Sequence, residues 1–421
     1  MTSETAAAGD GPRDVWRTPG YRVYLASRFI FHLVNRMLVV VLGWHVYGLT
    51  NDPLHLGYVG LAMFAPVLAV GLAAGDLADR FNRAGVVAAG SFTAFLASAG
   101  LLLLSLADTP DIAHIYIAAG LFGTAIAVSK PALWALLGQV VPARRFPAAV
   151  SLSTGAGQVA TIFGPALAGL LLLAGLTVGY AGIAVITFIA IGLAVLMIPA
   201  AAGAARAERR DRTPGHMLAG IRYIWSTPVL LGMVLLDLFA VLFGSVVALL
   251  PVFARDILDV GPAGLGALRA APAVGATAAA FFLARAMPRR GAGAVMLGFS
   301  ALFGISATVF ALSEIFLLSL IALAVGGVAD MVSVVMRQTV LQLGTPDAMR
   351  GRVNAAAQVF ISASNEVGDF RAGAVAGWLG AAPAAAIGGL CTVAIAAGCA
   401  WAFPALRHLS DPRSIAADRQ S

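Results

Sequence analysis

The chain has 421 residues, of which 60% are hydrophobic and only 11% are charged, and its mean hydropathy is +0.90. This composition excludes a soluble globular domain, because such domains carry about a quarter of their residues as charged side chains. The formal net charge of +7 does not call for a nucleic-acid partner, because the basic residues lie where a membrane protein places them.

Twelve apolar stretches follow one another along the chain, and each is close to the about 20 residues that cross a bilayer. They lie near residues 21–48, 54–75, 84–107, 111–140, 148–174, 178–200, 229–257, 263–286, 291–312, 315–343, 352–379 and 382–404. The connection between the sixth and seventh contains GHMLAGIRYIWS, which is amphipathic and is expected to lie along the membrane surface. The predicted organisation is a tail (1–20), a six-helix half (21–200), a linker (201–228), a second six-helix half (229–404) and a tail (405–421).

Basic residues alternate between the connections. Loops and tails that carry arginine, such as those with Arg80, Arg144 and Arg289, alternate with loops that carry no lysine or arginine. Only the loop near Arg255 departs from this order. Because cytoplasmic loops have an excess of basic residues, the alternation predicts a multi-pass protein of the cytoplasmic (inner) membrane with both termini in the cytoplasm.

A short internal repeat links the two halves. Pro53–Gly57 (PLHLG) and Pro262–Gly266 (PAGLG) share the pattern P-x-x-L-G, and each opens the second span of its half. Duplicated halves are typical of secondary transporters. The predicted fold is therefore an all-α membrane protein with twelve transmembrane helices in two pseudo-symmetric six-helix halves.

Ionisable residues inside the spans recur at every third helix. Such residues are costly at bilayer depth, so they mark functional or paired positions. They lie in the first, fourth, seventh and tenth spans, with more in the eleventh, whereas the interiors of the third, sixth, ninth and twelfth contain none. We therefore expect helices one, four, seven and ten to line a polar cavity. The candidates for the cavity or for ion pairs are Arg28, Asn35, Arg36, Lys130, Asp237, Arg337, Asn365 and Arg371.

Two of these positions suggest specific roles. Lys130 is the only lysine of the chain and lies several residues inside its span, which favours a cavity or ion-pair role over a side chain that reaches back to the membrane surface. Arg28 and Asp237 are separated by the same number of residues as Gly57 and Gly266, so they occupy equivalent places in the two halves. This offset makes an ion pair between Arg28 and Asp237 a reasonable expectation.

The stretch ISASNEVGDFRAG, residues 361–373, places several polar side chains between apolar runs. Glu366 and Asp369 are three residues apart and therefore share one helix face, with Asn365 one turn before Asp369. Two neighbouring carboxylates in a low dielectric cannot both ionise cheaply, so one of them is expected to take up a proton near neutrality. Both are therefore candidates for proton coupling.

Two alternatives to that interpretation stay open. Asp330, alone in GGVADMVSV at the middle of the tenth span, is a competing proton carrier. The carboxylates of the eleventh span can also belong to a fixed network, in which Arg371, Arg36 or Arg337 hold them and orient the helix.

A polar turn follows the second span. Its sequence, GDLADRFNR at residues 75–83, resembles the signature loop of the major facilitator superfamily, G-x-L-A-D-R-x-G-R-K. Asn82 stands where that pattern has glycine, and asparagine also tolerates left-handed backbone. The resemblance implies that the loop controls the conformational cycle through Gly75, Asp79, Arg80 and Arg83.

The fifth span contains FGPALAG, residues 163–169, which resembles the antiporter motif G-P-x-x-G-G of the same superfamily, with Ala168 in place of the first paired glycine. Small residues and a proline suit close packing between helices. In the family this motif accompanies export. The resemblance therefore implies a gate formed by Gly164, Pro165 and Gly169.

Longer segments, including LLPVFARDIL and ADMVSVVMRQTVLQLGTPDAMRGRVNA, look like the branch of the superfamily that includes the enterobactin exporter and macrolide efflux proteins. The resemblance covers nearly the whole chain. It implies proton-coupled efflux of an amphipathic small molecule, a siderophore or a drug-like compound, by alternating access. The expected partners are this substrate, protons and membrane lipids, and the chain is expected to act as a monomer without nucleic acid.

Other functions remain open. An uptake permease or a lysophospholipid flippase has the same fold, and a non-transporting membrane sensor has the same charges. An enzyme is not expected, because the six histidines show no metal-ligand spacing and no serine nucleophile motif is present. No G-x-x-x-x-G-K-[ST] pattern for phosphate binding occurs, and no cofactor or metal is expected.

Overall fold

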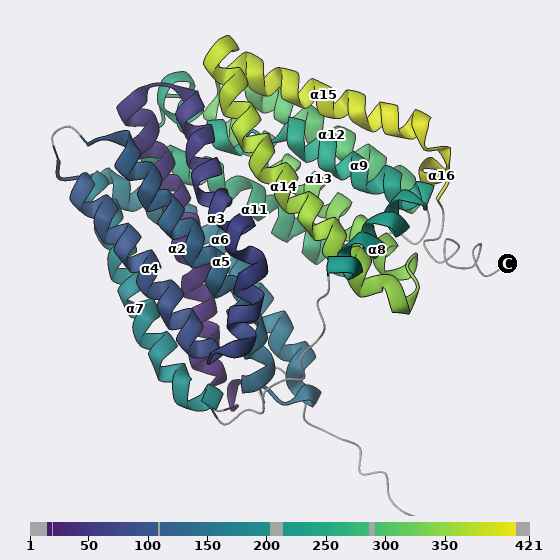
Figure 1. Ribbon diagram of the computed structural model, residues 1–421. Coiled ribbons are helices and arrows are strands. Elements are labelled where there is room, and N and C mark those ends of the chain that lie inside the picture. Colours follow the sequence, from purple (N-terminus) through teal and green to yellow (C-terminus); the bar gives the residue numbers. More distant parts are fainter. Residues whose placement is uncertain (1–14, 19, 108–109, 203–213, 286–290, 410–421) are drawn as a thin grey trace, which may run out of the picture. The chain divides into compact units, whose positions relative to one another are not determined.

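The structure is a computed structural model that describes residues 15–18, 20–107, 110–202, 214–285 and 291–409; for residues 71–80, 143, 200–202, 214–218, 347–348 and 355 it describes the backbone only. Every regular element in these ranges is a helix (Figure 1). The chain folds into two compact units. The first unit comprises Met1–Val46 and Ala62–Arg209, and the second comprises Tyr47–Leu61 and Arg210–Ser421.

The first unit contains most of six long helices. These are α2 (Tyr21–Thr50), α3 (Pro53–Arg80), α4 (Arg83–Leu104), α5 (Ile112–Val140), α6 (Phe146–Leu173) and α7 (Leu176–Ala202). The end of α2 and the start of α3 belong to the second unit. Helix α4 packs against both α5 and α7.

Local sequence explains where these helices begin. Asp111 caps α5, because its side chain accepts a hydrogen bond from the amide of Ala113 at 2.9 Å. Pro147 lies in the first turn of α6, where its missing amide proton is no loss. The buried Tyr21 hydroxyl donates to the carbonyl of Ala149 at 3.0 Å, which ties the start of α2 to the start of α6.

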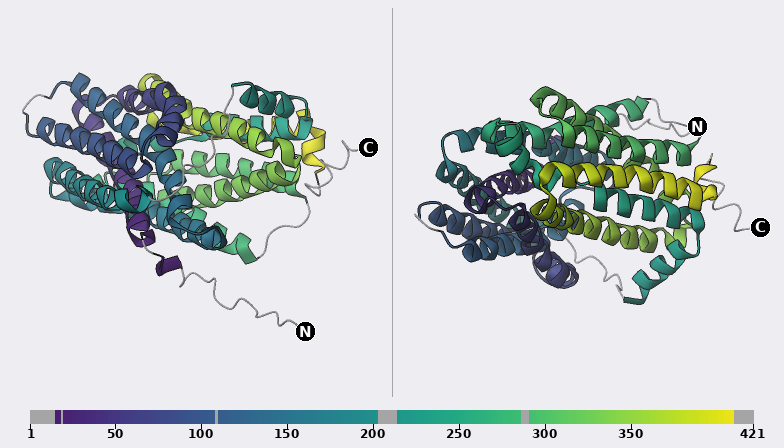
Figure 2. Two further views of the ribbon diagram at one scale, coloured as in Figure 1. Left: turned by 60° about the horizontal axis from the view of Figure 1, so that its bottom comes forward. Right: turned by 90° about the horizontal axis from the view of Figure 1, so that it is seen from above.

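The second unit contains the remaining helices. They are α8 (Pro214–Trp225), α9 (Pro228–Gly244), η2 (Val247–Leu249), α10 (Leu250–Val252), η3 (Phe253–Ile257), α11 (Gly261–Arg285), α12 (Ala292–Leu312), α13 (Phe316–Leu343), α14 (Asp347–Leu379), α15 (Ala381–Ala402) and α16 (Pro404–Arg407). Helix α13 lies beside α11 and α12, and α15 lies beside α9 and α12 (Figure 2). The rings of Phe253 and Phe310, whose centroids are 4.5 Å apart, fill the space between η3 and α12.

The predicted membrane fold is confirmed. Eleven of the described helices are long and apolar enough to cross a membrane. Helix α14 is the twelfth long helix, and it carries the charged residues of the 361–373 stretch. Large apolar side chains are exposed on helices whose interiors carry no charge, among them Leu103 on α4, Leu196 on α7 and Leu312 on α12. Such surfaces suit contact with acyl chains rather than water.

Two local expectations need correction. The seventh span was expected as one continuous helix over 229–257, but α9 ends at Gly244 and a short irregular step precedes η2. Asn82 does not adopt left-handed backbone (φ −60°, ψ 119°); it is the cap of α4 and accepts hydrogen bonds from the amides of Ala84 and Gly85. The glycine of the family pattern is therefore replaced here by a helix cap.

The linker helix is α8. Its described residues pack against α14, where Gly220 lies beside the backbone of Arg352. Ile224 is buried in the same core as Leu230 of α9. Its location at the membrane surface stays a prediction.

Candidate functional site

The seventh span is interrupted at its centre. Helix α9 ends at Gly244, and the amide of Ser245 closes that end by donating to the carbonyl of Val241 at 3.2 Å. A helix end leaves its last carbonyls without intrahelical donors. At membrane depth there is no water to satisfy them unless the site lines a cavity, so other parts of the protein must supply donors.

Arg371 of α14 supplies those donors. Its Nε donates to the carbonyl of Leu242 at 2.8 Å, and its Nη2 donates to the carbonyl of Phe243 at 2.7 Å. The guanidinium carbon also lies 5.3 Å from the centroid of the Phe243 ring. The planar fork of arginine can reach two successive carbonyls at once. Arg371 therefore caps the broken end of α9.

The neighbouring residues of α14 fit the same role. A Cβ atom on Gly368 would lie 3.1 Å from the carbonyl oxygens of Val241 and Leu242, so glycine allows α14 to approach α9 closely. Asp369 accepts a hydrogen bond from the hydroxyl of Ser245 at 2.5 Å. The segment Gly368–Arg371 thus holds both sides of the break.

Two arginines act on Asp369. Arg269 of α11 and Arg371 both act electrostatically on its carboxylate. Nη2 of Arg269 donates to the carbonyl of Val247, 3.3 Å away, on the far side of the break. The structure therefore brings Asp369 and Arg371 together in one network. Ser245 and Arg269 are partners that were not predicted, although Arg269 is a charged residue inside the expected span 263–286.

The other polar residues of this stretch lie one turn earlier. Asn365 is exposed, and its side-chain amide donates to the carbonyl of Ile361 in its own helix at 3.0 Å. Glu366 is half-buried and shares the α14 face of Asp369. Proton coupling by Glu366 or Asp369 stays a prediction.

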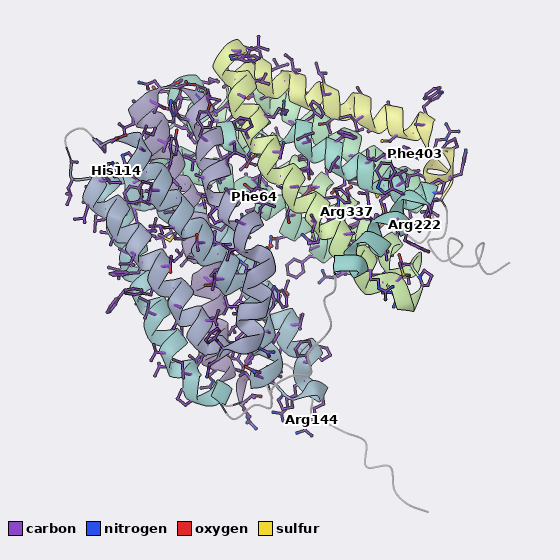
Figure 3. The ribbon with its side chains drawn as sticks, in the orientation of Figure 1. Phe64, His114, Arg144, Arg222, Arg337 and Phe403 are labelled. Carbon is purple, nitrogen blue, oxygen red and sulfur yellow. The ribbon has the colours of Figure 1, made fainter. Side chains whose placement is uncertain are left out.

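Asp237 and Arg337 form an ion pair inside the second unit. Arg337, labelled in Figure 3, comes from α13, and its Nη1 contacts Oδ1 of Asp237 on α9. Both side chains are buried, with exposures of 5% and 9%. The expected pairing of Asp237 with Arg28 is therefore wrong, because Asp237 finds its partner in its own unit. Leu238 and Phe360 are among the residues that surround the pair.

Asp330 differs from these paired carboxylates. It lies near the middle of α13 (Phe316–Leu343), and its side chain is exposed. No hydrogen bond or ion pair joins it to the described part of the chain. It precedes Arg337 by seven residues, so both lie on the α13 face that turns Arg337 toward α9.

In the first unit, four basic side chains gather on α2 and α5. Arg28, His32 and Arg36 are spaced four residues apart and share one face of α2. The guanidinium carbon of Arg28 lies 3.9 Å from the centroid of the Trp134 ring on α5. Lys130, one turn before Trp134, is exposed on the same face of α5. The facing sides of α2 and α5 therefore carry these basic side chains together.

Asn35 lies beside this group but faces a different space. It lines a small cavity between α2, α4, α5 and α7. The other lining residues are mostly apolar, such as Phe31 and Phe122. The hydroxyl of Ser27 also lines the cavity and has no hydrogen-bond partner within the described residues. The polar cavity expected between helices one, four, seven and ten stays a prediction.

Glycines of α6 let the basic face of α2 come close. A Cβ atom on Gly157 would lie 3.3 Å from the His32 ring, and one on Gly164 would lie 2.7 Å from Cβ of Arg36. Gly164 belongs to the predicted gate motif, in which Pro165 and Gly169 are also buried. The motif therefore packs directly against the charged stretch of α2.

Replacing Gly164 by alanine is expected to destabilise the protein by about 1 to 3 kcal/mol, because the new methyl group overlaps Cβ of Arg36 and neither atom can rotate away. The measurement is the thermal midpoint of the purified protein. Gly155→Ala on the same helix is the control, since its Cβ would meet nothing within 4 Å. Equal midpoints for the two variants would contradict the close contact.

The signature loop is described only in part. Helix α3 continues through Gly75 and Asp79 to Arg80, but the side chains of these residues lie outside the described part of the structure. Arg83 donates from Nη1 to the carbonyl of Ala135 on α5 at 3.0 Å. The control of the conformational cycle by this loop stays a prediction.

Several residues near these charges were not predicted from the sequence. Trp134 had a usable signal, because it lies one helical turn after Lys130. Ser245 follows a glycine, and Gly/Ser pairs are frequent places for a helix to break. The contact of the Tyr47 hydroxyl with the Asp256 carboxylate gives no comparable sequence signal, because a long stretch of chain separates the two.

Comparisons with known proteins agree with this architecture. Residues 17–419 match the family model of the transmembrane secretion effectors, a family of the major facilitator superfamily. The enterobactin exporter EntS of Shigella boydii serotype 18 is 28% identical over 365 residues, which cover 86% of each chain. EntS of Citrobacter koseri is 28% identical over 368 residues, with the same coverage.

Solved structures show the same fold. A bacterial homologue of the human lysosomal transporter Spinster matches with a TM-score of 0.70 at 14% identity and covers 92% of this chain and 96% of its own. A peptide transporter POT in complex with sulfate matches with a TM-score of 0.71 at 14% identity, covering 95% and 99%. These likenesses concern the helical architecture alone.

Proposed function

Because the chain belongs to the transmembrane secretion effector family of the major facilitator superfamily, we propose that it exports an amphipathic small molecule across the cytoplasmic membrane in exchange for protons. The substrate is a siderophore or a drug-like compound, and the two halves expose it alternately to the two sides. The protein acts as a monomer with both termini in the cytoplasm. The names of the relatives, which are enterobactin exporters, support the direction of transport.

The observation that carries proton coupling is the contrast among the membrane carboxylates of the second unit. Asp237 is neutralised by Arg337, and Asp369 is held by Ser245 beside two arginines. Asp330 is exposed at mid-helix and has no partner in the described part of the chain. An acid without fixed partners can gain and lose a proton without breaking other bonds, which is what coupling needs. Asp330 is therefore the first candidate, and Glu366 is the second.

Asp330→Asn is expected to remove the dependence of transport on the pH gradient, because the amide keeps the shape of the side chain but cannot carry the proton. The measurement is substrate flux in proteoliposomes with and without an imposed pH gradient. The wild-type protein should respond by about tenfold, within the usual range of coupling between two ligands. Asp369→Asn is the comparison, and it should retain the response.

An unchanged response in Asp330→Asn would refute this assignment. If Glu366→Gln alone lost the response, the proton carrier would be Glu366. If the wild-type protein transported substrate without responding to the gradient, proton coupling itself would be refuted.

A further inference from the structure

We propose that the exported molecule is an amphipathic anion and that the basic face of the first unit, made by Arg28, His32, Arg36 and Lys130, binds its negatively charged group. This inference rests on the proposed function and adds the chemical class of the substrate. A fitting group is a carboxylate, a phosphate, a sulfonate or an ionised phenol on an apolar body.

The first support is the absence of compensating charge. The membrane-spanning stretches of the first unit contain no aspartate or glutamate; they are 21–46, 62–70, 83–104, 112–140, 146–173 and 176–199. The acids of α3, Asp76 and Asp79, follow its membrane-spanning stretch. The second unit differs, because Arg337 has Asp237 as a partner and Arg371 has two carbonyls. Positive charges at bilayer depth are costly unless something neutralises them. A ligand with negative charge is the natural counter-ion.

The second support is the state of Arg28. Its side chain is buried, with an exposure of 5%, and its Nε makes no hydrogen bond within the described part of the chain. The flat side of its guanidinium is covered by Trp134. A buried donor without an acceptor is costly, so an acceptor from a ligand would stabilise this arrangement. Arg36 and Lys130 are exposed beside it and are free to contact an incoming anion.

The third support is the depth at which Arg36 and Lys130 lie within their membrane-spanning helices. Arg36 lies roughly 15 residues from the Tyr21 end of α2 and roughly 14 from the Thr50 end, or about 22 Å and 21 Å along the helix. Lys130 lies roughly ten residues, about 15 Å, from the Val140 end of α5. Both cations are therefore too deep for the head groups of the surrounding lipids. The same negative charge on a transported molecule can reach them, because such a molecule enters a cavity at the midplane.

The surroundings favour an amphipathic rather than a small inorganic anion. Trp134 is 44% exposed and offers an aromatic surface next to Lys130. The neighbouring His32 ring packs on Phe31, with ring centroids 5.6 Å apart. An apolar body can lie on these rings while its charged group contacts the cations.

The test is equilibrium binding to the full chain in nanodiscs of zwitterionic lipid. Three dansyl probes with the same undecyl chain are compared, one ending in a carboxylate, one in a neutral amide and one in an amine. Binding of each probe to empty nanodiscs is subtracted. The carboxylate is expected to bind about tenfold tighter than the amide, and the amine is expected to bind most weakly.

Variants locate the site. Arg36→Gln and Lys130→Gln are each expected to weaken binding of the carboxylate probe by about fivefold and to leave binding of the amide probe unchanged. Both residues are exposed, so their replacement does not open the core. Arg22→Gln is the matched control, because Arg22 is an exposed cation at the start of the same helix. The Arg22→Gln variant should bind all three probes with the affinities of the wild-type protein.

Three results would overturn the proposal. One is equal binding of carboxylate and amide, or tighter binding of the amine. Another is an Arg22→Gln effect as large as that of Arg36→Gln, which would indicate a general effect of net charge. The third is loss of carboxylate binding when anionic lipid is added to the nanodiscs, which would identify lipid head groups as the occupant.

The binding assay and the transport assay test the anion site and the proposed function separately. If the carboxylate binds with the expected pattern but nothing is exported, the proposed function is refuted and the anion site stands. If export is observed but no preference for the anion appears, the exporter stands and the anion site is refuted.

Discussion

Asp237→Asn is expected to destabilise the protein by about 3 to 5 kcal/mol, because it leaves the guanidinium of Arg337 buried without its counter-ion. The measurement is the thermal midpoint and the yield of folded protein in mild detergent. Glu314→Gln is the control, since Glu314 is an exposed carboxylate just before the start of α13. Its midpoint should equal that of the wild-type protein.

The double variant Asp237→Leu with Arg337→Met separates charge from packing. Replacing both partners of a buried pair by apolar side chains of similar size is often neutral or stabilising. The double variant is therefore expected to be more stable than Asp237→Asn. If Asp237→Asn melts like the wild-type protein, the ion pair contributes nothing and its burial is not the constraint that the structure indicates.

Arg371→Gln is expected to destabilise the seventh span by about 2 to 4 kcal/mol, because the carbonyls of Leu242 and Phe243 lose their charged donor. The stability of Arg371→Lys should lie between that of the wild-type protein and that of Arg371→Gln, since an ammonium group keeps the charge but cannot span two carbonyls in the same geometry. The measurement is amide hydrogen exchange over residues 241–249, together with the thermal midpoint. Exchange at the break should accelerate selectively.

Arg285→Gln is the matched control for that experiment. Arg285 is exposed and donates to one carbonyl, that of Phe281 in its own helix. Its loss should change neither exchange at the break nor the midpoint. If Arg371→Gln behaves in the same way, α14 does not hold the broken helix together.

The helices were largely predictable because apolar periodicity and loop charge are properties of the chain itself. The expected span 111–140 corresponds to α5 (Ile112–Val140), and the expected span 315–343 corresponds to α13 (Phe316–Leu343). The break after Gly244 was missed, since the apolar run continues through it to Val252 without a proline before Pro251. Hydropathy does not distinguish a continuous helix from a broken one when both are buried.

The partners of the charges were less predictable than their positions. The repeat offset suggested Arg28 for Asp237, but Asp237 pairs with Arg337 of its own unit. Arg371 was expected to contact carboxylates, yet its main acceptors are two backbone carbonyls. Those acceptors exist only because α9 ends there, and the hydropathy pattern does not reveal that end.

The two units differ in the charges that their membrane-spanning helices carry. Counted over the whole chain, the acids and bases of the spans nearly balance. The acids inside the membrane-spanning stretches, among them Asp237, Asp330, Glu366 and Asp369, belong to the second unit, whereas the membrane-spanning stretches of the first unit carry bases alone. This distribution is the basis for assigning anion binding to the first unit and proton transfer to the second.

The most direct test of proton-driven export is accumulation of a labelled substrate in inside-out membrane vesicles that contain the chain, energised by respiration. A panel of catecholate siderophores, macrolides and lipophilic cations covers the substrate classes considered. We expect at least one compound to accumulate in the vesicle lumen, and an uncoupler to abolish the accumulation. Accumulation in right-side-out vesicles instead, or accumulation that persists with the uncoupler, would contradict proton-driven export.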